Sequence, residues 1–232
     1  MMHRVTKAAI AASIAFGMIA PAQATAQDTG SIINRYDRAE LDEGKADAIE
    51  SQQAMYDYGA CLAKARRRQV ERYLATAPFS ASADKVARQI VLDACLDAGE
   101  IQFATEAIRG PFYQALYRMD FPLEVAADLG KAPALDYSQG GAASGDVLTN
   151  LRRFADCVVR QAPDGARKLA LSRVGSNEEK AAFQALMPAM GGCIAPGDKV
   201  SFKPPLLRAV MGEVLYRLTA ASVGRPLAMD RK

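Results

Sequence analysis

The sequence predicts an all-α protein built from two tandem three-helix repeats. Each repeat is expected to hold an antiparallel helical hairpin, closed by a disulfide, and a third helix that packs against the hairpin. Three observations lead to this fold class. Apolar residues recur at helical spacing along most of the chain. An ordered series of residues returns after 96 to 99 positions, and the four cysteines occupy corresponding places in that series.

The internal match covers most of the two predicted repeats. It joins residues 58–61 with 154–157, residues 95–100 with 193–198, and residues 116–118 with 215–217. The offset grows from 96 to 98 between the first two pairs of segments, and Gly191 and Gly192 account for this change. Single matches of this kind arise by chance, but an ordered series with so few gaps indicates the duplication of one unit.

In the first repeat we expect helices over residues 55–75, 82–95 and 105–119. Pro78 separates the first two, and Ser82 is placed to cap the second. The apolar residues of this second helix recur at i, i+3, i+4 and i+7, which is typical of a buried helix face. Pro111 should make the third helix short or kinked.

The second repeat follows the same plan with stronger boundary signals. Ser176 and Glu179 form a capping-box pattern, in which each side chain satisfies a free backbone N–H group. Pro204 and Pro205 are placed to open the last helix. Pro163 should break the first helix of this repeat, whereas the matching residues of the first repeat are expected to continue their helix.

These elements divide the chain into six parts. The expected bounds are 1–26 for a signal peptide, 27–57 for an acidic arm and the start of the first helix, 58–118 for the first repeat, 119–153 for a linker, 154–218 for the second repeat, and 219–232 for a tail. The arm is weakly periodic, so we expect it to be loosely held. The linker is rich in Gly, Ala, Ser and Pro.

The first residues are typical of a secretory signal peptide. A short basic start precedes an apolar run of thirteen residues at 8–20, which is shorter than the roughly 20 residues that span a bilayer. Small residues favour cleavage after Ala24 or Ala26. No later apolar run is long enough for a membrane helix. We therefore expect a mature protein that is periplasmic or secreted and does not span a membrane.

Composition restricts the chemistry of the mature chain. Residues 27–232 contain 27 basic and 26 acidic residues, so we expect no large electrostatic footprint for nucleic acid. His3 is the only histidine and leaves with the signal peptide. Catalytic arrangements that depend on histidine are thereby excluded, as are histidine-rich metal sites. The sequence contains no motif for a cofactor, and we expect neither a cofactor nor a metal.

The four cysteines of an exported chain predict two disulfides. The midpoint of the first two cysteines is Pro78, and the midpoint of the last two is Gly175, so each midpoint falls at a predicted hairpin turn. Residues equidistant from the turn of an antiparallel hairpin lie side by side. The predicted pairs are therefore Cys61–Cys95 and Cys157–Cys193. Each closed loop should stabilise the fold by about 3–4 kcal/mol in the loop-entropy model.

Two weak patterns for catalysis remain. Ser82 and Lys85 match the S-x-x-K spacing of serine acyl-transferases, but the partner motifs are absent and a helix cap explains the serine. Asp93, Asp97 and Glu100 are close enough in sequence to form a carboxylate cluster, and glycoside hydrolysis needs only two such groups. The same spacing is found on any solvated helix face.

The densest positive charge lies near the end of the first predicted helix. It comprises Lys64, Arg66, Arg67, Arg68 and Arg72. These side chains could contact phosphate groups of the outer envelope or an acidic partner. The simpler interpretation is a solvated helix face that meets the acidic arm around Asp42, Glu43 and Asp47.

The polar residues that recur in both repeats are the candidate binding residues. They are Arg109, Tyr117 and Arg118 in the first repeat and Arg208, Tyr216 and Arg217 in the second. Arginine and tyrosine often anchor interfaces, which favours a binding surface. The alternative is that each arginine ties its own third helix to an acid such as Glu100 or Asp198.

The sequence therefore predicts an exported, non-catalytic helical module that binds a ligand or supports the envelope. It does not identify the ligand, and another envelope protein is the partner class that we consider. Two alternatives stay open. One is a small periplasmic hydrolase that depends on carboxylates, and the other is an inhibitor or immunity protein directed against a secreted enzyme.

Export predicts a defined N-terminus. Terminal sequencing of protein recovered from the periplasm or medium should begin at Thr25 or Gln27, because small residues precede both positions. Intact chains that begin at Met1 and remain in the cytoplasm would contradict the prediction.

Overall fold

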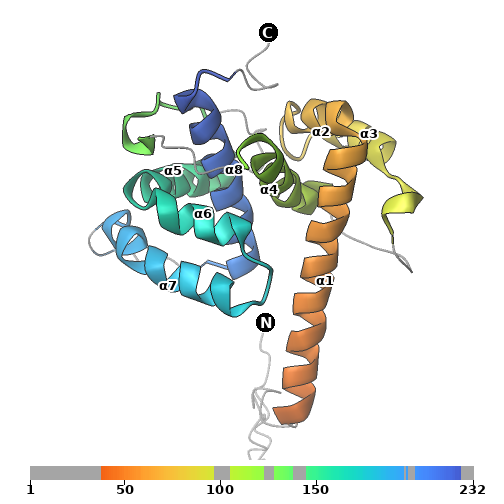
Figure 1. Cartoon of the computed structure of the whole chain (residues 1–232), viewed down its shortest axis with the longest axis horizontal. Coiled ribbons are helices and arrows are strands. Elements are labelled where there is room, and N and C mark those ends of the chain that lie inside the picture. The colour runs from red at the N-terminus through yellow and green to blue at the C-terminus, as the bar shows by residue number, and fades with distance from the viewer. Residues whose placement is uncertain are drawn as a thin grey trace, which may run out of the picture.

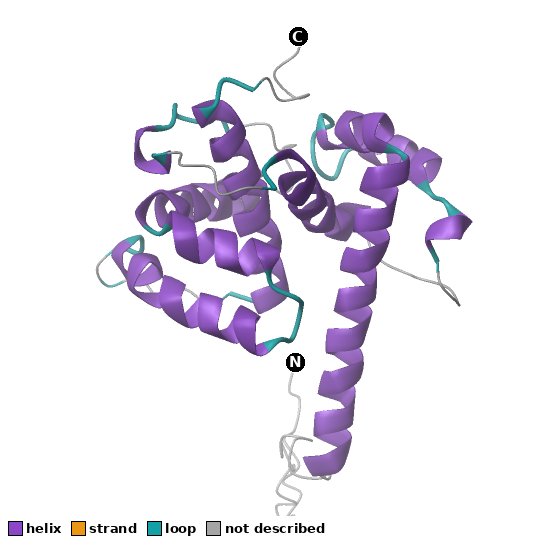
Figure 2. Ribbon diagram, viewed as in Figure 1, coloured by secondary structure: helices purple, strands orange, loops and turns teal. Residues whose placement is uncertain are grey.

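The computed structural model describes residues 38–96, 105–122, 128–137, 145–195, 197 and 202–225. Within these ranges the protein is all-helical and contains no strand (Figure 2). The α-helices are α1 (Arg38–Ala65), α2 (Arg67–Leu74), α3 (Ala81–Ile90), α4 (Arg109–Asp120), α5 (Gly145–Gln161), α6 (Pro163–Leu171), α7 (Asn177–Gly192) and α8 (Pro204–Ser222). None of these helices is both long and apolar enough to cross a bilayer. The predicted signal peptide lies outside the described residues.

Two helices at the centre organise the rest. Helices α4 and α8 pack against each other, and each also packs against one long neighbour, α1 beside α4 and α5 beside α8. Figure 1 shows α2 and α3 next to the end of α1, and α5 and α6 beside α8, with α7 packed on α5 and α6. The first half of α1 projects beyond the other helices (Figure 1).

A glycine permits the close approach of α4 and α8. A Cβ atom placed on Gly110 of α4 would overlap the Cβ of Ala209 and would lie 2.7 Å from its Cα. Any larger side chain at this position would therefore push the two helices apart. Gly110 and Ala209 are 99 residues apart, which is the offset of the predicted repeat in this region.

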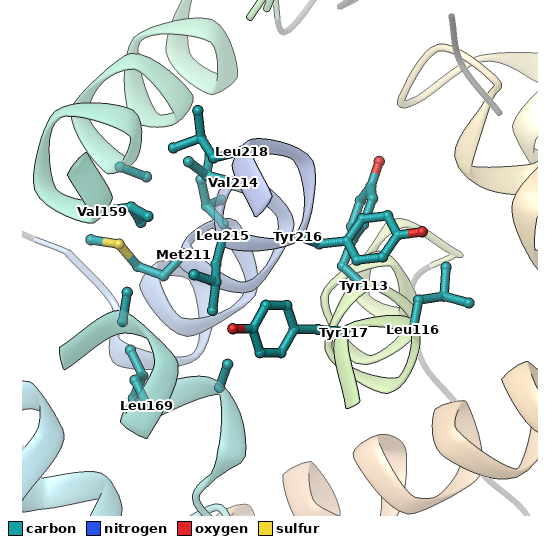
Figure 3. Packing of buried hydrophobic residues seen from close by; sticks show 14 of the residues in the cluster. Tyr113, Leu116, Tyr117, Val159, Leu169, Met211, Val214, Leu215, Tyr216 and Leu218 are labelled. Atoms are coloured by element: carbon teal, nitrogen blue, oxygen red, sulfur yellow. The ribbon is translucent and has the colours of Figure 1, made fainter. Parts of the chain in front are cut away.

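Aromatic side chains fill the space next to this contact. The rings of Tyr113 on α4 and Tyr216 on α8 lie 5.8 Å apart and point toward one another between the two helices (Figure 3). Phe121 contacts the rings of both Tyr117 and Tyr216, at 5.5 and 5.9 Å. Aliphatic residues of α5, α6 and α8 continue the core on the other side of α8 (Figure 3).

Both predicted disulfides are confirmed. Cys61 of α1 pairs with Cys95 in a short 3-10 turn after α3, with a Cα–Cα distance of 5.6 Å. Cys157 of α5 pairs with Cys193 at the end of α7, with a Cα–Cα distance of 5.9 Å. Each bond ties a long helix to the segment that returns past it.

The first predicted helix is interrupted in a place that the sequence did not indicate. The expected helix over 55–75 breaks at Arg66 (φ −131°, ψ 37°), and α2 begins at the next residue. Ala162, 96 residues later, has nearly the same backbone angles before Pro163, where the break was predicted. The first residue of α2 is Arg67, whereas the first residue of α6 is a proline. The guanidinium of Arg67 pairs with Asp120 at 2.8 Å, and α2 buries one apolar face. Tertiary packing turns the chain here.

The second predicted helix is shorter than expected. Ser80, not Ser82, caps α3, because the Ser80 hydroxyl accepts a hydrogen bond from the N–H of Ala83 at 3.1 Å. The helix ends at Ile90 instead of reaching residue 95, and Val91 is 57% exposed. The chain must leave the helix here because the disulfide draws Cys95 back to α1.

Other helix boundaries agree with the sequence. Ser176 caps α7 by accepting from the N–H of Glu179 at 3.1 Å, and Pro204 opens α8. The third helix expected over 105–119 appears as a 3-10 turn, Thr105–Ile108, followed by α4. Pro111 does not break α4, because it lies in the first turn, where an N–H group has no partner within the helix.

The acidic arm does not meet the basic run. Residues 38–45, expected in a loosely held arm, are the first turns of α1, and residues 145–153 of the expected linker belong to α5. Asp47 and Lys64 stand on the same continuous helix, 17 residues apart. At 1.5 Å per residue this separates them by roughly 25 Å along the axis. The two charged regions therefore lie at opposite ends of α1.

The close contact of α4 and α8 predicts opposite effects for two glycine substitutions. Gly110→Ala should lower the free energy of unfolding by about 1–3 kcal/mol, because the new methyl group overlaps Ala209. Gly191→Ala on α7 should leave it unchanged or raise it by up to about 1 kcal/mol, since nothing lies within 4 Å of its Cβ position. Urea denaturation of both variants measures the difference. Equal stability of the Gly110→Ala variant and the parent chain would contradict the packing described.

Candidate functional site

A pocket of about 280 Å³ opens between α1, α4, the end of α6 and α8. Its polar lining residues are Gln53, Tyr56, Asp57, Gln114, Arg118, Ser172, Arg173 and Arg208. They come from both predicted repeats, so the pocket lies where the two meet. We call it the Arg118 pocket.

Arg118 is one of the two exposed arginines that line this pocket, the other being Arg173. The Nη2 atom of Arg118 donates to the carbonyl oxygens of Ala170, Leu171 and Ser172, at distances of 3.0 to 3.2 Å. It forms no ion pair with any acid in the described ranges. Partial burial, followed by repulsion from Arg208, lowers the pKa of Arg118, and the attraction of Asp57 opposes this only in part. The pocket therefore holds a positive charge that is incompletely neutralised.

Arg208 forms the buried wall of the pocket. Its Nη1 atom lies 2.6 Å from a carboxylate oxygen of Glu179, and its Nη2 atom donates to the Ser172 carbonyl oxygen at 2.7 Å. Nη2 also donates to the side-chain oxygen of Gln114 at 3.2 Å, while the guanidinium carbon lies 4.9 Å from the centre of the Tyr56 ring. These contacts hold Arg208 firmly in place.

The Tyr56 hydroxyl is a donor without an acceptor. The side chain is 7% exposed, and its oxygen has no hydrogen-bond partner among the described residues. Burial raises the pKa of Tyr56 to about 12, although the positive charge of Arg208 acts in the opposite direction. The hydroxyl therefore keeps its proton at neutral pH and can donate it to a ligand that enters the pocket.

The other matched arginine, Arg109, performs the same structural task as Arg208. It donates to the carbonyl oxygens of Leu74 and Thr76 at 2.9 and 3.2 Å, and its guanidinium lies over the Tyr73 ring. The two arginines thus satisfy the free carbonyl groups at the ends of α2 and α6. Their acidic partners are Glu106 and Glu179. The expected partners, Glu100 and Asp198, lie outside the described residues.

The remaining predicted binding residues are buried and engaged. Arg217 donates to the Asp136 carbonyl oxygen at 2.8 Å and pairs with Glu213, which also binds Arg152 at 2.9 Å. The Tyr216 hydroxyl donates to Asp120 at 3.0 Å, and the Tyr117 hydroxyl accepts from Arg167 at 3.2 Å. Of the six predicted residues, only Arg118 is exposed. The structure brings Arg118 and Arg208 together at one pocket and places the other four elsewhere.

The structure describes both residues of the serine pattern and only Asp93 of the carboxylate pattern. The Ser82 hydroxyl lies 2.8 Å from that of Ser80, and both Ser82 and Lys85 are exposed on α3. Asp93 is exposed, while Asp97 and Glu100 lie outside the described residues. Within those residues, no group of three or more acidic, cysteine or histidine side chains is arranged to hold a metal ion.

Sequence reasoning missed Tyr56 and Gln114. The predicted binding residues are polar residues that recur at the repeat offset, and these two do not recur. Arg152 stands 96 residues after Tyr56, and Glu213 stands 99 residues after Gln114. The amide at position 114, where the predicted repeat has an acid at position 213, is a sequence signal that could have pointed to this pocket.

No protein-family model, curated protein or solved structure matches this chain.

The role of Arg208 predicts a large loss of stability on substitution. Arg208→Met should lower the free energy of unfolding by about 3–5 kcal/mol, because the buried Glu179 carboxylate loses its ion-pair partner and the end of α6 loses its donor. Arg173→Gln, an exposed neighbour, should change it by less than about 0.5 kcal/mol. Urea denaturation tests both, and a small effect of Arg208→Met would show that the end of α6 does not depend on this arginine.

Proposed function

We propose that this chain is an exported, non-catalytic binding protein, that it consists of two copies of one helical unit, and that it binds a small anionic ligand in the Arg118 pocket. The ligand is a compound with a carboxylate or phosphate group. The two copies meet at the pocket, and the differences between them create the site.

The two-copy arrangement is supported by matched local structure. Phe79 and Gly175, 96 residues apart, both have positive φ angles, of 58° and 75°. The N–H of Phe79 donates to Glu106, and the N–H of Gly175 donates to Glu179. These are the same two acids that pair with the capping arginines. A turn and an arginine thus recur at matched positions, while the acid that joins them comes from a different place in each half, Glu106 before α4 and Glu179 in the first turn of α7.

The observation that carries the ligand assignment is that Arg118 forms no ion pair among the described residues, although Asp57 also lines the pocket. Arg217, the residue that matches Arg118, has Glu213 four positions before it and pairs with that acid. Arg118 has Gln114 four positions before it, and an amide cannot neutralise a guanidinium. An anionic group in the pocket would supply the charge that Glu213 supplies to Arg217.

The hydrogen-bonding groups of the pocket favour the same ligand. The Tyr56 hydroxyl is a buried donor that lacks an acceptor. A buried donor without a partner costs about 1–3 kcal/mol, which a ligand oxygen would recover. Hydrogen bonds to an ionised acceptor are the strongest of this kind. The volume of about 280 Å³ suits a compound smaller than a typical drug molecule.

The proposed export rests on the signal-peptide pattern and is supported by the two disulfides. Disulfides persist in the periplasm and outside the cell, and thiols are kept reduced in most cytosols. Both bonds have Cα–Cα distances within the usual range for disulfides, at 5.6 and 5.9 Å.

Thermal shift measurements with inorganic phosphate, succinate and citrate test the proposed function. At least one of these anions should raise the melting temperature of the mature protein, because a ligand at 100 times its Kd stabilises by about 2.7 kcal/mol. Arg118→Gln should abolish the shift while leaving the ligand-free protein folded. Tyr56→Phe should weaken binding roughly tenfold or more, since it removes one hydrogen bond to a charged group.

Arg153→Gln is the matched control, because it removes an exposed arginine of α5 outside the Arg118 pocket. It should leave the shift intact. The proposal is wrong if none of the three anions changes the melting temperature, or if the change persists in the Arg118→Gln variant.

A further inference from the structure

A second group of exposed cations surrounds the α2–α3 hairpin. It consists of Lys64 on α1, Arg68 and Arg72 on α2, and Lys85 and Arg88 on α3. All five are exposed, and none takes part in an ion pair among the described residues. We call them the hairpin cations. Residues 64–90 contain seven basic and two acidic residues, whereas the mature chain as a whole is nearly neutral.

The two acids of this segment do not balance the excess charge. Glu71 is bound to Arg67 at 2.9 Å, and Asp84 is partly buried. The acidic first half of α1 lies at the far end of that helix. The hairpin cations therefore form an uncompensated positive surface that nothing else in the described chain covers.

An exposed aromatic residue stands at the turn of the same hairpin. Phe79 is 61% exposed, and its φ angle of 58° lies in the left-handed region that a bulky side chain rarely adopts. The residue 96 positions later, Gly175, adopts a similar φ without strain. Ile49 of α1 lies against Gly175, whereas most of the Phe79 side chain is exposed. The strained conformation thus presents a phenyl ring to solvent.

We propose that the α2–α3 hairpin docks on an anionic lipid surface, with the Phe79 ring entering the interface and the hairpin cations contacting phosphate headgroups. This inference goes beyond the proposed ligand site, because it uses other residues. It rests on the proposed export only for the location of the membrane.

Three features favour a lipid surface over an acidic protein as the partner. An aromatic ring flanked by lysine and arginine is typical of membrane interfaces, where the ring lies at headgroup depth and the cations remain hydrated. Long, flexible cations from three helices suit a fluid array of charges, since no fixed pattern of acids is required. The Arg118 pocket is lined by other residues, so the hairpin has no share in that concave site.

Vesicle co-sedimentation of the mature protein tests the proposal. The protein should bind vesicles of phosphatidylglycerol and phosphatidylcholine but not vesicles of phosphatidylcholine alone. Raising sodium chloride from about 0.05 M to about 0.5 M should release it, because salt screens exposed charges.

Phe79→Gly separates a docking role from a structural one. The substitution should raise the melting temperature, because glycine relieves the strain at φ 58°, and it should weaken vesicle binding. If Phe79 had only a structural role, replacing it would not both raise the melting temperature and weaken vesicle binding. The double variant Arg72→Gln/Lys85→Gln should weaken binding about 25-fold, since each cation near an anionic surface contributes roughly fivefold.

Lys168→Gln/Lys180→Gln is the charge-matched control, because it removes two exposed cations of α6 and α7. It should bind vesicles like the parent chain, as should Arg118→Gln, which affects only the ligand pocket. The proposal is overturned if phosphatidylglycerol vesicles do not bind the protein, or if the hairpin variants bind as well as the control. It is also overturned if Phe79→Gly instead dissociates a dimer in light scattering and leaves vesicle binding unchanged.

Discussion

The architecture depends on how two buried helix ends obtain hydrogen-bond donors. The carbonyl groups of Leu74 and Ser172, at the ends of α2 and α6, lie in buried surroundings that limit the access of water. Arg109 and Arg208 each donate to these groups, pair with an acid, and lie over a tyrosine ring. A single planar side chain thus terminates a helix, anchors the acid that holds the following turn, and packs against the core. Because Glu179 stands in the first turn of α7, its pair with Arg208 also joins α7 to α8.

The same interaction explains why the Arg118 pocket is polar. Placing Arg208 at the end of α6 puts a buried guanidinium beside Arg118, which donates to the same carbonyl groups. Around Glu213, Arg152 and Arg217 share one carboxylate inside the protein. Gln114, four positions before Arg118, carries no charge, and Arg118 forms no ion pair among the described residues. The Arg118 pocket therefore contains an exposed cation that no acid of the described chain pairs with.

The predictions from sequence were correct where the signal was local or was repeated along the chain. The cysteine midpoints located both disulfides, and Ser176 and Pro204 marked the starts of α7 and α8. They failed where packing competes with local pattern. The break at Arg66 has no local signal, since it follows from the contact of Arg67 with Asp120 and from burial of one face of α2. Ser82 looked like a cap, but the chain enters α3 two residues earlier.

By itself the sequence determined the helical class, the disulfide pairs and the residues shared by the two halves. Periodicity and spacing are sufficient for these, because they depend on neighbours along the chain. Only the tertiary structure decided which shared residues are buried. Arg109, Arg208 and Arg217 recur in the sequence in the same way as Arg118, yet these three are buried and Arg118 is exposed. Whether a side chain is exposed, and whether an acid lies near it, depends on which helices meet. Such contacts between distant segments cannot be read from the spacing of residues within each segment.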